Sequence, residues 1–301
     1  MSDRGKTAYT LAGFAAILFW STSVPLARGV SEKLGHLHAA ALIQLIGGLL
    51  GLSFAARQGG YAGRIRALPI KYLLICGALF VSYMFFYYCA IGGVTERSQV
   101  LETGLLNYLW PALTLLFSVP LLKKKARAGL VPGMVMALAG VVLAVNHGSL
   151  SGASALFSNL SGGSLFHLSA LSAAVVWGLY SNFSRRFAGA EEEGAVPLFM
   201  IASFLAIFPL TFLFPETSRW TPAAFGELAA ISIFSALGYI LWEAAMRNGD
   251  MVLVSSASFF TPLLSTLLSG WYLGVPVGAG IWAACAFIII GAVICRRSIS
   301  G

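Results

Sequence analysis

The residues of this chain that could take part in binding or chemistry are mostly aromatic rings and neutral polar groups. Residues three or four apart lie side by side on a helix. Three segments combine aromatic and hydroxyl side chains at this spacing: Trp177, Tyr180, Ser181 and Ser184; Ser232, Ser235, Tyr239 and Trp242; and Tyr83 with Tyr87. Rings offer surfaces for stacking, and hydroxyl groups donate or accept hydrogen bonds. Such faces predict a roomy, mostly neutral cavity, with aromatic packing between helices as the alternative for each residue alone.

Groups that could hold a metal or catalyse a reaction do not cluster in the sequence. The four cysteines show no CxxC spacing, which is typical of small buried packing residues. His36 and His38 are two residues apart and would point to different faces of a helix. A membrane-embedded enzyme needs clustered His, Asp or Glu, and the apolar segments carry no such cluster. The sequence therefore predicts no metal site, no cofactor and no enzymatic activity.

Charged residues inside the apolar segments are few, and the most notable is Glu243. Arg247 follows it by four residues, one helical turn, so the two can pair. We interpret Glu243 and Arg247 as an ion pair or a gate, with a proton-linked or substrate-contacting role as the alternative. Without a buried cluster of basic residues, strongly anionic substrates are disfavoured. Without a central acidic pair, a substrate with a permanent positive charge is disfavoured as well.

These residues lie in long apolar segments that predict an all-α integral membrane protein. Of the 301 residues 58% are hydrophobic and 10% are charged, whereas soluble domains carry roughly 25% charged residues. Blocks of about 20 apolar residues cross a bilayer as helices. Ten transmembrane helices are predicted, at about 7–29, 37–57, 71–94, 98–121, 127–147, 166–187, 195–214, 223–248, 251–273 and 277–296.

The basic residues are distributed unevenly between the two sides of these spans. With the N-terminus inside, 15 of the 19 Lys and Arg residues fall on the cytoplasmic side, and the other four are Arg28, Lys33, Arg97 and Arg219. This is the positive-inside pattern. We therefore expect both termini in the cytoplasm and the chain in the bacterial inner membrane. The net charge of +8 orients the chain in the lipid bilayer and implies no nucleic-acid partner.

The spans divide into two halves with matching marks. Polar residues and one proline recur at an offset of 151: Asn107, Pro111, Thr114 and Ser118 match Ser258, Pro262, Ser265 and Ser269. A Gly/Ser-rich linker, 147–163, separates the halves, so residues 1–150 and 151–301 are predicted to be two five-helix repeats. Coincidence is the alternative, because Ser and Thr are frequent in membrane helices. An odd number of spans inverts the second repeat, as in many secondary transporters.

The two matched prolines mark the predicted transport site. Pro111 and Pro262 lack a backbone donor near the middle of their spans, so a carbonyl is freed nearby. Broken helices at corresponding positions of two repeats are a sequence sign of a binding site. We expect both prolines to act as hinges, with static kinks as the alternative.

Several segments resemble a known family. "FWSTSVP" at 19–25, "VWGLYSN" at 176–182 and the five-plus-five arrangement resemble the drug/metabolite transporter (DMT) superfamily, EamA type. Trp20-Ser21 departs from the Trp-Gly pair at 177–178. The string Asn-Tyr-Leu-Trp-Pro at 107–111 is more specific and resembles exporters of aromatic amino acids within that family. The resemblance implies export of aromatic and other hydrophobic amino acids; a drug, nucleoside or nucleotide sugar on the same fold is the alternative.

The expected transporter works by alternating access around a central cavity, and a monomer suffices for transport. The cavity is expected between the third, fourth, sixth, eighth and ninth spans, with the first adjacent. Aromatic surfaces would come from Trp20, Tyr83, Tyr87, Trp177, Tyr239 and Trp242. Asn107, Ser181 and Asn182 would bind the amine or carboxylate of the substrate.

Overall fold

The computed structural model describes residues 3–57, 59–145, 164–187, 195–250, 253–254 and 257–300. Its elements in chain order are α1 (Asp3–Ser21), α2 (Ser23–Leu34), α3 (His36–Arg57), α4 (Tyr61–Ala67), η1 (Tyr72–Cys76), α5 (Gly77–Gly93), α6 (Arg97–Asn107), α7 (Trp110–Leu122), β1 (Lys125–Ala126), α8 (Leu130–Val145), α10 (Ser164–Arg186), α11 (Val196–Ile207), α12 (Leu210–Leu213), α13 (Pro222–Asn248), η2 (Ser258–Phe260), α15 (Thr261–Leu273), α16 (Ala279–Arg297) and β2 (Ile299–Ser300). The predicted linker at 147–163, the boundary at 150/151 and the first two residues of the ninth predicted span lie outside the described residues.

Seven helical segments of the described chain are long and apolar enough to cross a membrane. They are Gly5–Leu34, His36–Arg57, Tyr72–Gly93, Arg97–Leu122, Val196–Leu213, Pro222–Asn248 and Ala279–Arg297. Each coincides with a predicted span. The other three predicted spans correspond to the shorter α8, to the less apolar α10, and to η2 with α15. The chain is therefore an all-α membrane protein.

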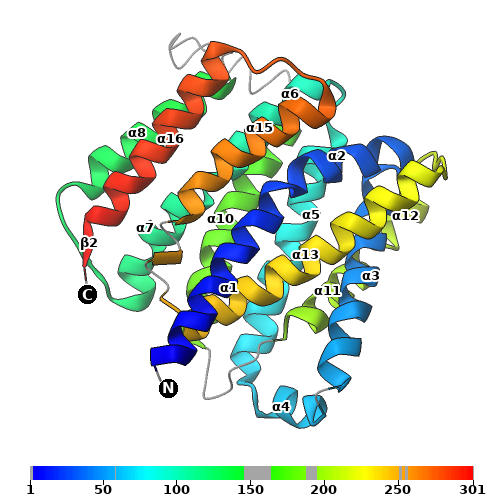
Figure 1. Ribbon diagram of the computed structural model, residues 1–301, viewed down its shortest axis with the longest axis horizontal. Coiled ribbons are helices and arrows are strands. Elements are labelled where there is room, and N and C mark those ends of the chain that lie inside the picture. The colour runs from blue at the N-terminus through cyan, green and yellow to red at the C-terminus, as the bar shows by residue number, and fades with distance from the viewer. Residues whose placement is uncertain are drawn as a thin grey trace.

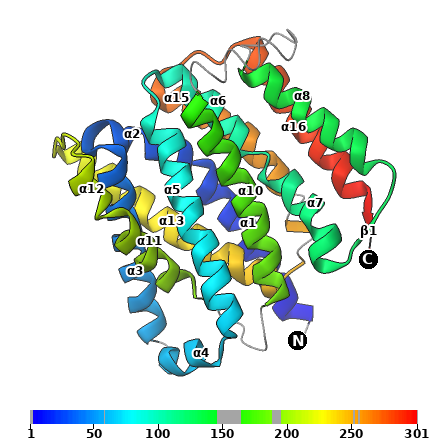
Figure 2. The same cartoon turned by 180° about the vertical axis from the view of Figure 1, so that it is seen from behind.

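The helices form an inclined bundle whose neighbours are often far apart in sequence (Figure 1). α1 packs on α13, α5 on α10 and α3 on α11. Seen from behind, α5 and α10 run side by side through the middle of the bundle (Figure 2). The marked N- and C-termini lie at the same end of the bundle (Figure 1). Large apolar side chains such as Leu74 and Phe212 are exposed on the outside, as lipid requires.

α8 and α16 form a separate pair at one edge of the bundle, and glycines bring them close together (Figures 1 and 2). A Cβ atom built on Gly291 would lie 2.5 Å from the backbone nitrogen of Ala137. Only glycine permits this approach, as in other small-residue contacts between membrane helices. Beyond the helix ends, β1 and β2 pair antiparallel, with Lys125 opposite Ser300.

α7 and α15 begin 151 residues apart and share several features. Each has 13 residues, each carries its proline at the second position, and each follows a break in its span. Each also ends in a left-handed residue, Lys123 with φ 55° and Gly274 with φ 67°. Pro111 and Pro262 therefore lie in the first turn of the second helical piece, where a missing N–H is tolerated. The breaks precede the prolines.

The segment 214–221 is tied to the beginning of α3 by one carboxylate. Glu216 accepts hydrogen bonds from the backbone N–H groups of His36, Leu37 and His38 at 2.9, 2.9 and 3.2 Å. Its Oε1 also lies 2.6 Å from Nδ1 of His36. The first N–H groups of a helix have no partner within the helix, so a carboxylate stabilises them. Burial acts to raise the pKa of Glu216, but the hydrogen bond and charge of His36 and the backbone N–H groups outweigh it and lower the pKa to about 2.

Candidate functional site

A small cavity lies in the middle of the bundle, at the level of the two helix breaks. Its lining residues come from α1, α2, α5, α6, α7, α10, α13 and α15, namely Trp20, Ser23, Tyr83, Tyr87, Asn107, Tyr108, Trp110, Trp177, Tyr239 and Thr261. Six of these are predicted site residues: Trp20, Tyr83, Tyr87, Asn107, Trp177 and Tyr239. The cavity volume is about 20 Å³, which is enough for a water molecule. The side chains that line the cavity therefore fill most of the space between the helices.

The walls of the cavity are aromatic rings that contact one another across the two halves of the chain. The ring centroids of Tyr83 and Trp177 are 4.6 Å apart, and those of Trp20 and Trp177 are 5.3 Å apart. Tyr239 lies 5.5 Å from both tryptophans. Tilted and edge-to-face arrangements at these distances are favourable for aromatic pairs. Rings on α1, α5, α10 and α13 thus form one continuous aromatic surface.

Glycines beside the tryptophans explain how the rings fit between tightly packed helices. A Cβ atom on Gly238 would lie 2.5 Å from Nε1 of Trp20. A Cβ atom on Gly178 would lie 3.2 Å from the backbone nitrogen of Thr114. Gly238 therefore leaves room for the indole of Trp20, and Gly178 lets α10 approach α7.

Four polar atoms at the cavity lack a hydrogen-bond partner within the described part of the chain. They are Nε1 of Trp20, Oδ1 of Asn107, Oη of Tyr108 and Oγ1 of Thr261. Buried polar atoms of native proteins normally find a partner in protein or water. One donor, one acceptor and two hydroxyl groups that can do both are thus available to a water molecule or to a bound solute.

Three other predicted site residues lie behind the cavity wall. Trp242 packs with its ring centroid 4.9 Å from that of Trp20. Nδ2 of Asn182 donates to the carbonyl oxygens of Thr114 and Gly178 at 2.9 and 2.8 Å, so it fastens α10 to α7. Ser181 is buried and does not line the cavity.

Glu243 and Arg247 belong to a polar cluster near the C-terminal end of α13. Glu243 accepts hydrogen bonds from Oη of Tyr72 and, at 3.1 Å, from Oγ of Ser184. The guanidinium of Arg247 lies over the ring of Tyr72, 5.4 Å from its centroid. Tyr72 also accepts from the backbone N–H of Ala195 at 3.0 Å. Tyr72 begins a π-helical turn, a feature common at functional sites.

The sequence patterns missed Ser23, Tyr108, Trp110 and Thr261 at the cavity and Tyr72 at the cluster. The offset of 151 could have identified two of them, because Trp110 and Thr261 directly precede the matched prolines. Tyr87 donates to Ser23 at 3.3 Å, and no spacing in the sequence announces that contact. Within the described residues, no group of three or more His, Cys, Asp or Glu side chains could hold a metal ion.

Comparisons with known proteins agree with this arrangement. The sequence profile described as "EamA-like transporter family" matches residues 7–146 and 164–297. The chain is 31% identical over 289 residues to the aromatic amino acid exporter YddG of Salmonella typhimurium, covering 95% of this chain and 96% of the relative. It is 33% identical over 295 residues to the protein of the same name from Ancylobacter novellus, covering 96% and 97%. A crystal structure with 28% sequence identity superposes with a TM-score of 0.72, covering 96% of this chain and 98% of the other.

Proposed function

The chain belongs to the EamA-like transporter family, and we propose that it exports aromatic and other hydrophobic amino acids across the bacterial inner membrane by alternating access. It is a multi-pass membrane transporter. The observation that carries the substrate proposal is the cavity walled by Trp20, Tyr83, Trp177 and Tyr239 from both halves of the chain. The printed name of several full-length relatives, aromatic amino acid exporter, supports the same substrate class.

The cavity chemistry suits an amino acid with a ring. A side-chain ring can stack against the aromatic walls. The ammonium group can donate to Asn107 Oδ1 and Thr261 Oγ1, and the carboxylate can accept from Trp20 Nε1. At about 20 Å³ the cavity is too small for such a solute, so binding requires the rings or the helices to move apart.

The proposed architecture is ten transmembrane helices in two inverted five-helix repeats, 1–150 and 151–301. The two segments matched by the family profile, 7–146 and 164–297, support this division. Reciprocal packing supports it as well. In this division α1 corresponds to α10, α5 to α13 and α7 to α15. The contact of α1 with α13 then corresponds to that of α10 with α5, and the contact of α10 with α7 corresponds to that of α1 with α15. α3 with α11 and α8 with α16 map onto themselves.

In such a cycle, Pro111 and Pro262 act as hinges at the matched breaks, and the cluster around Glu243 and Arg247 closes the cytoplasmic side. Both termini are placed in the cytoplasm. The excess of basic residues on that side and the position of both termini at one end of the bundle support this orientation (Figure 1). We propose that a monomer in the lipid bilayer is sufficient for transport.

Transport by the purified protein in proteoliposomes tests the proposal. Vesicles loaded with each amino acid in turn, with and without a pH gradient, should release phenylalanine, tyrosine, tryptophan and leucine faster than protein-free vesicles. Aspartate and lysine should not be released faster. Movement of a nucleoside or a cationic drug without movement of any hydrophobic amino acid would contradict the substrate and support another solute on the same fold.

A further inference from the structure

A second, smaller cavity lies beside the first, between α2, α6 and α15. Its volume is about 10 Å³, and it is lined by Val24, Val100, Leu101, Gly104, Leu105, Tyr108, Ser265, Thr266 and Ser269. Tyr108 lines both cavities and is the partition between them. Oγ of Ser269 has no hydrogen-bond partner within the described chain. The second cavity thus repeats the character of the first on a smaller scale, with apolar walls and free polar atoms.

The second cavity lies farther toward one end of the bundle than the first. On α15 the lining runs from Thr261 in the first cavity to Ser269 in the second, a rise of about 12 Å along the helix axis. Continuing in this direction, α15 ends at Leu273, and α6 begins at Arg97. The positive-inside pattern places this end outside the cytoplasm.

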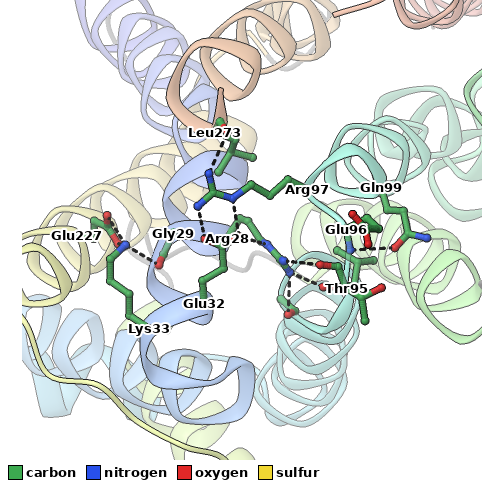
Figure 3. A network of polar contacts seen from close by, with 12 residues as sticks. Arg28, Gly29, Glu32, Lys33, Thr95, Glu96, Arg97, Gln99, Glu227 and Leu273 are labelled. Atoms are coloured by element: carbon green, nitrogen blue, oxygen red, sulfur yellow. Dashed lines mark hydrogen bonds and ion pairs between the residues drawn. The ribbon is translucent and has the colours of Figure 1, made fainter. Parts of the chain in front are cut away.

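One arginine joins the ends of the three helices that surround the second cavity (Figure 3). Arg97 on α6 donates from Nε and a terminal nitrogen to both carboxylate oxygens of Glu32 on α2, at 2.9 and 2.6 Å. Its other terminal nitrogen donates to the carbonyl oxygen of Leu273 on α15 at 3.0 Å. The three joined elements are the three walls of the cavity, so the contact covers its outer end.

Neighbouring polar contacts lie beside Arg97 and join further segments at the same end of the bundle (Figure 3). Arg28 donates to Glu32 at 2.9 Å and to the carbonyl oxygen of Thr95 at 3.2 Å, which holds the turn between α5 and α6. Lys33 on α2 lies 2.8 Å from both carboxylate oxygens of Glu227 on α13. Tyr272 on α15 donates to the same carboxylate at 2.5 Å. Three of the four basic residues predicted on this face therefore take part in contacts between helix ends at one end of the bundle.

The exposure of Arg97 suits a contact that opens repeatedly. The side chain of Arg97 is 52% exposed, and ion pairs in contact with water stabilise a structure only weakly because water solvates the separated charges. A fully buried pair would resist opening, since separated charges would remain without partners.

From these observations we propose that substrate leaves the central cavity past Tyr108, between α2, α6 and α15, and that the Glu32–Arg97–Leu273 contacts are the outer gate of this path. The proposal rests on the proposed transport function. It assigns Glu32 and Arg97 to the gate and Ser265 and Ser269 to the lining of the path.

Thiol labelling from outside the cell tests the gate without any substrate. In a background with the four native cysteines replaced, Ser269→Cys places a thiol in the second cavity. A charged, membrane-impermeant thiol reagent should label it slowly. Adding Arg97→Gln or Glu32→Gln should raise the labelling rate at least tenfold, because the closing contacts are lost.

Two controls make the labelling decisive. Arg219→Gln removes the remaining outer basic side chain, which makes none of the gate contacts, and should leave the rate unchanged. Ser118→Cys places a thiol on α7, 151 residues before Ser269 and on the proposed cytoplasmic side. It should remain unlabelled by the outside reagent in the two gate variants and in Arg219→Gln, and labelling at this position would report a loosened fold. An unchanged rate at position 269 in both gate variants, or an equal increase with Arg219→Gln, overturns the proposal. Because the labelling needs no substrate, its result is independent of the export measurement. The gate can therefore fail while amino acid export is confirmed, and export can fail while the gate is confirmed.

Discussion

Trp110 and Thr261 are the first residues of α7 and α15, and both line the central cavity. They stand 151 residues apart, each directly before a proline. Two halves of one chain thus present the same backbone feature, the start of a helix after a break, to one binding space. A bulky ring stands on one side and a small hydroxyl on the other, so the cavity is asymmetric in chemistry although the two helices begin in the same way.

The free hydroxyl of Thr261 provides the most direct test of substrate contact. Thr261→Val keeps the shape of the side chain and removes only the hydroxyl. Since that hydroxyl has no partner in the described protein, thermal stability should not fall. The loss of one hydrogen bond to substrate, about 1 kcal/mol, should raise KM about fivefold.

Thr114→Val is the matched control, because the hydroxyl of Thr114 donates to the carbonyl oxygen of Trp110 at 2.7 Å. This variant should leave KM unchanged. Equal KM values for the unmodified protein, Thr261→Val and Thr114→Val would show that Thr261 does not contact the substrate.

Asn182 should act as a structural anchor. Asn182→Ala leaves the buried carbonyl oxygen of Thr114 without its side-chain donor, which costs about 1–3 kcal/mol. We expect a lower melting temperature in detergent and an unchanged KM in the remaining folded protein. A higher KM at an unchanged melting temperature would instead support the direct substrate contact predicted from the sequence.

Tyr72 should hold the polar cluster around Glu243 together. Tyr72→Phe removes the donor to Glu243 and the acceptor for the N–H of Ala195. The expected destabilisation is about 1–3 kcal/mol, measured by thermal unfolding. Ser184→Ala removes only one donor to the same carboxylate and should cost less. A smaller effect for Tyr72→Phe than for Ser184→Ala would contradict the central position of Tyr72.

The contact of Glu216 with α3 should depend on pH. The pKa of Glu216 in the folded protein is about 2, below its ordinary value of 4.5, because the His36 and backbone contacts outweigh burial. A lowered pKa means that the carboxylate stabilises the fold above pH 4.5 and that this stabilisation is lost as the pH falls toward 2. Glu216→Gln should therefore lower the melting temperature at pH 6 and have little effect near pH 2. Ser218→Ala breaks a neutral hydrogen bond of the same segment to Leu34, and its effect should not vary with pH.

The matched prolines should bias the transport cycle in opposite directions. Pro111→Ala and Pro262→Ala each supply an N–H that can join the two helical pieces of the span. A bias of about 1.4 kcal/mol changes the ratio of inward-facing to outward-facing molecules tenfold. Thiols introduced at positions 118 and 269 report the two sides. One variant should increase labelling at 118 and the other at 269; a change on the same side in both variants, or none, would leave the prolines as static kinks.

The sequence predicted the fold class and six lining residues of the cavity because helical spacing determines which side chains share a face. It did not determine which neighbour that face meets. Asn182 lies on the predicted face, yet its amide turns to α7. Tyr72 was missed because its partner Glu243 is 171 residues away. The sequence predicted Arg28, Lys33 and Arg97 on one face as a group, but their pairing depends on contacts such as Lys33 with Glu227 that only the folded chain brings together.

The pair of helices α8 and α16 at the edge of the bundle is a suitable attachment site for a structural probe. The close backbone contact at Gly291 prevents α8 and α16 from sliding along each other, and the β1–β2 pairing joins the two helices again beyond their ends. None of the described side chains that line the two cavities comes from this pair. An antibody fragment or a rigid fusion attached at the turn beside Lys125 and Ser300 would therefore add mass for electron cryomicroscopy and mark the orientation of each particle, while the helices that carry the solute keep their freedom to move.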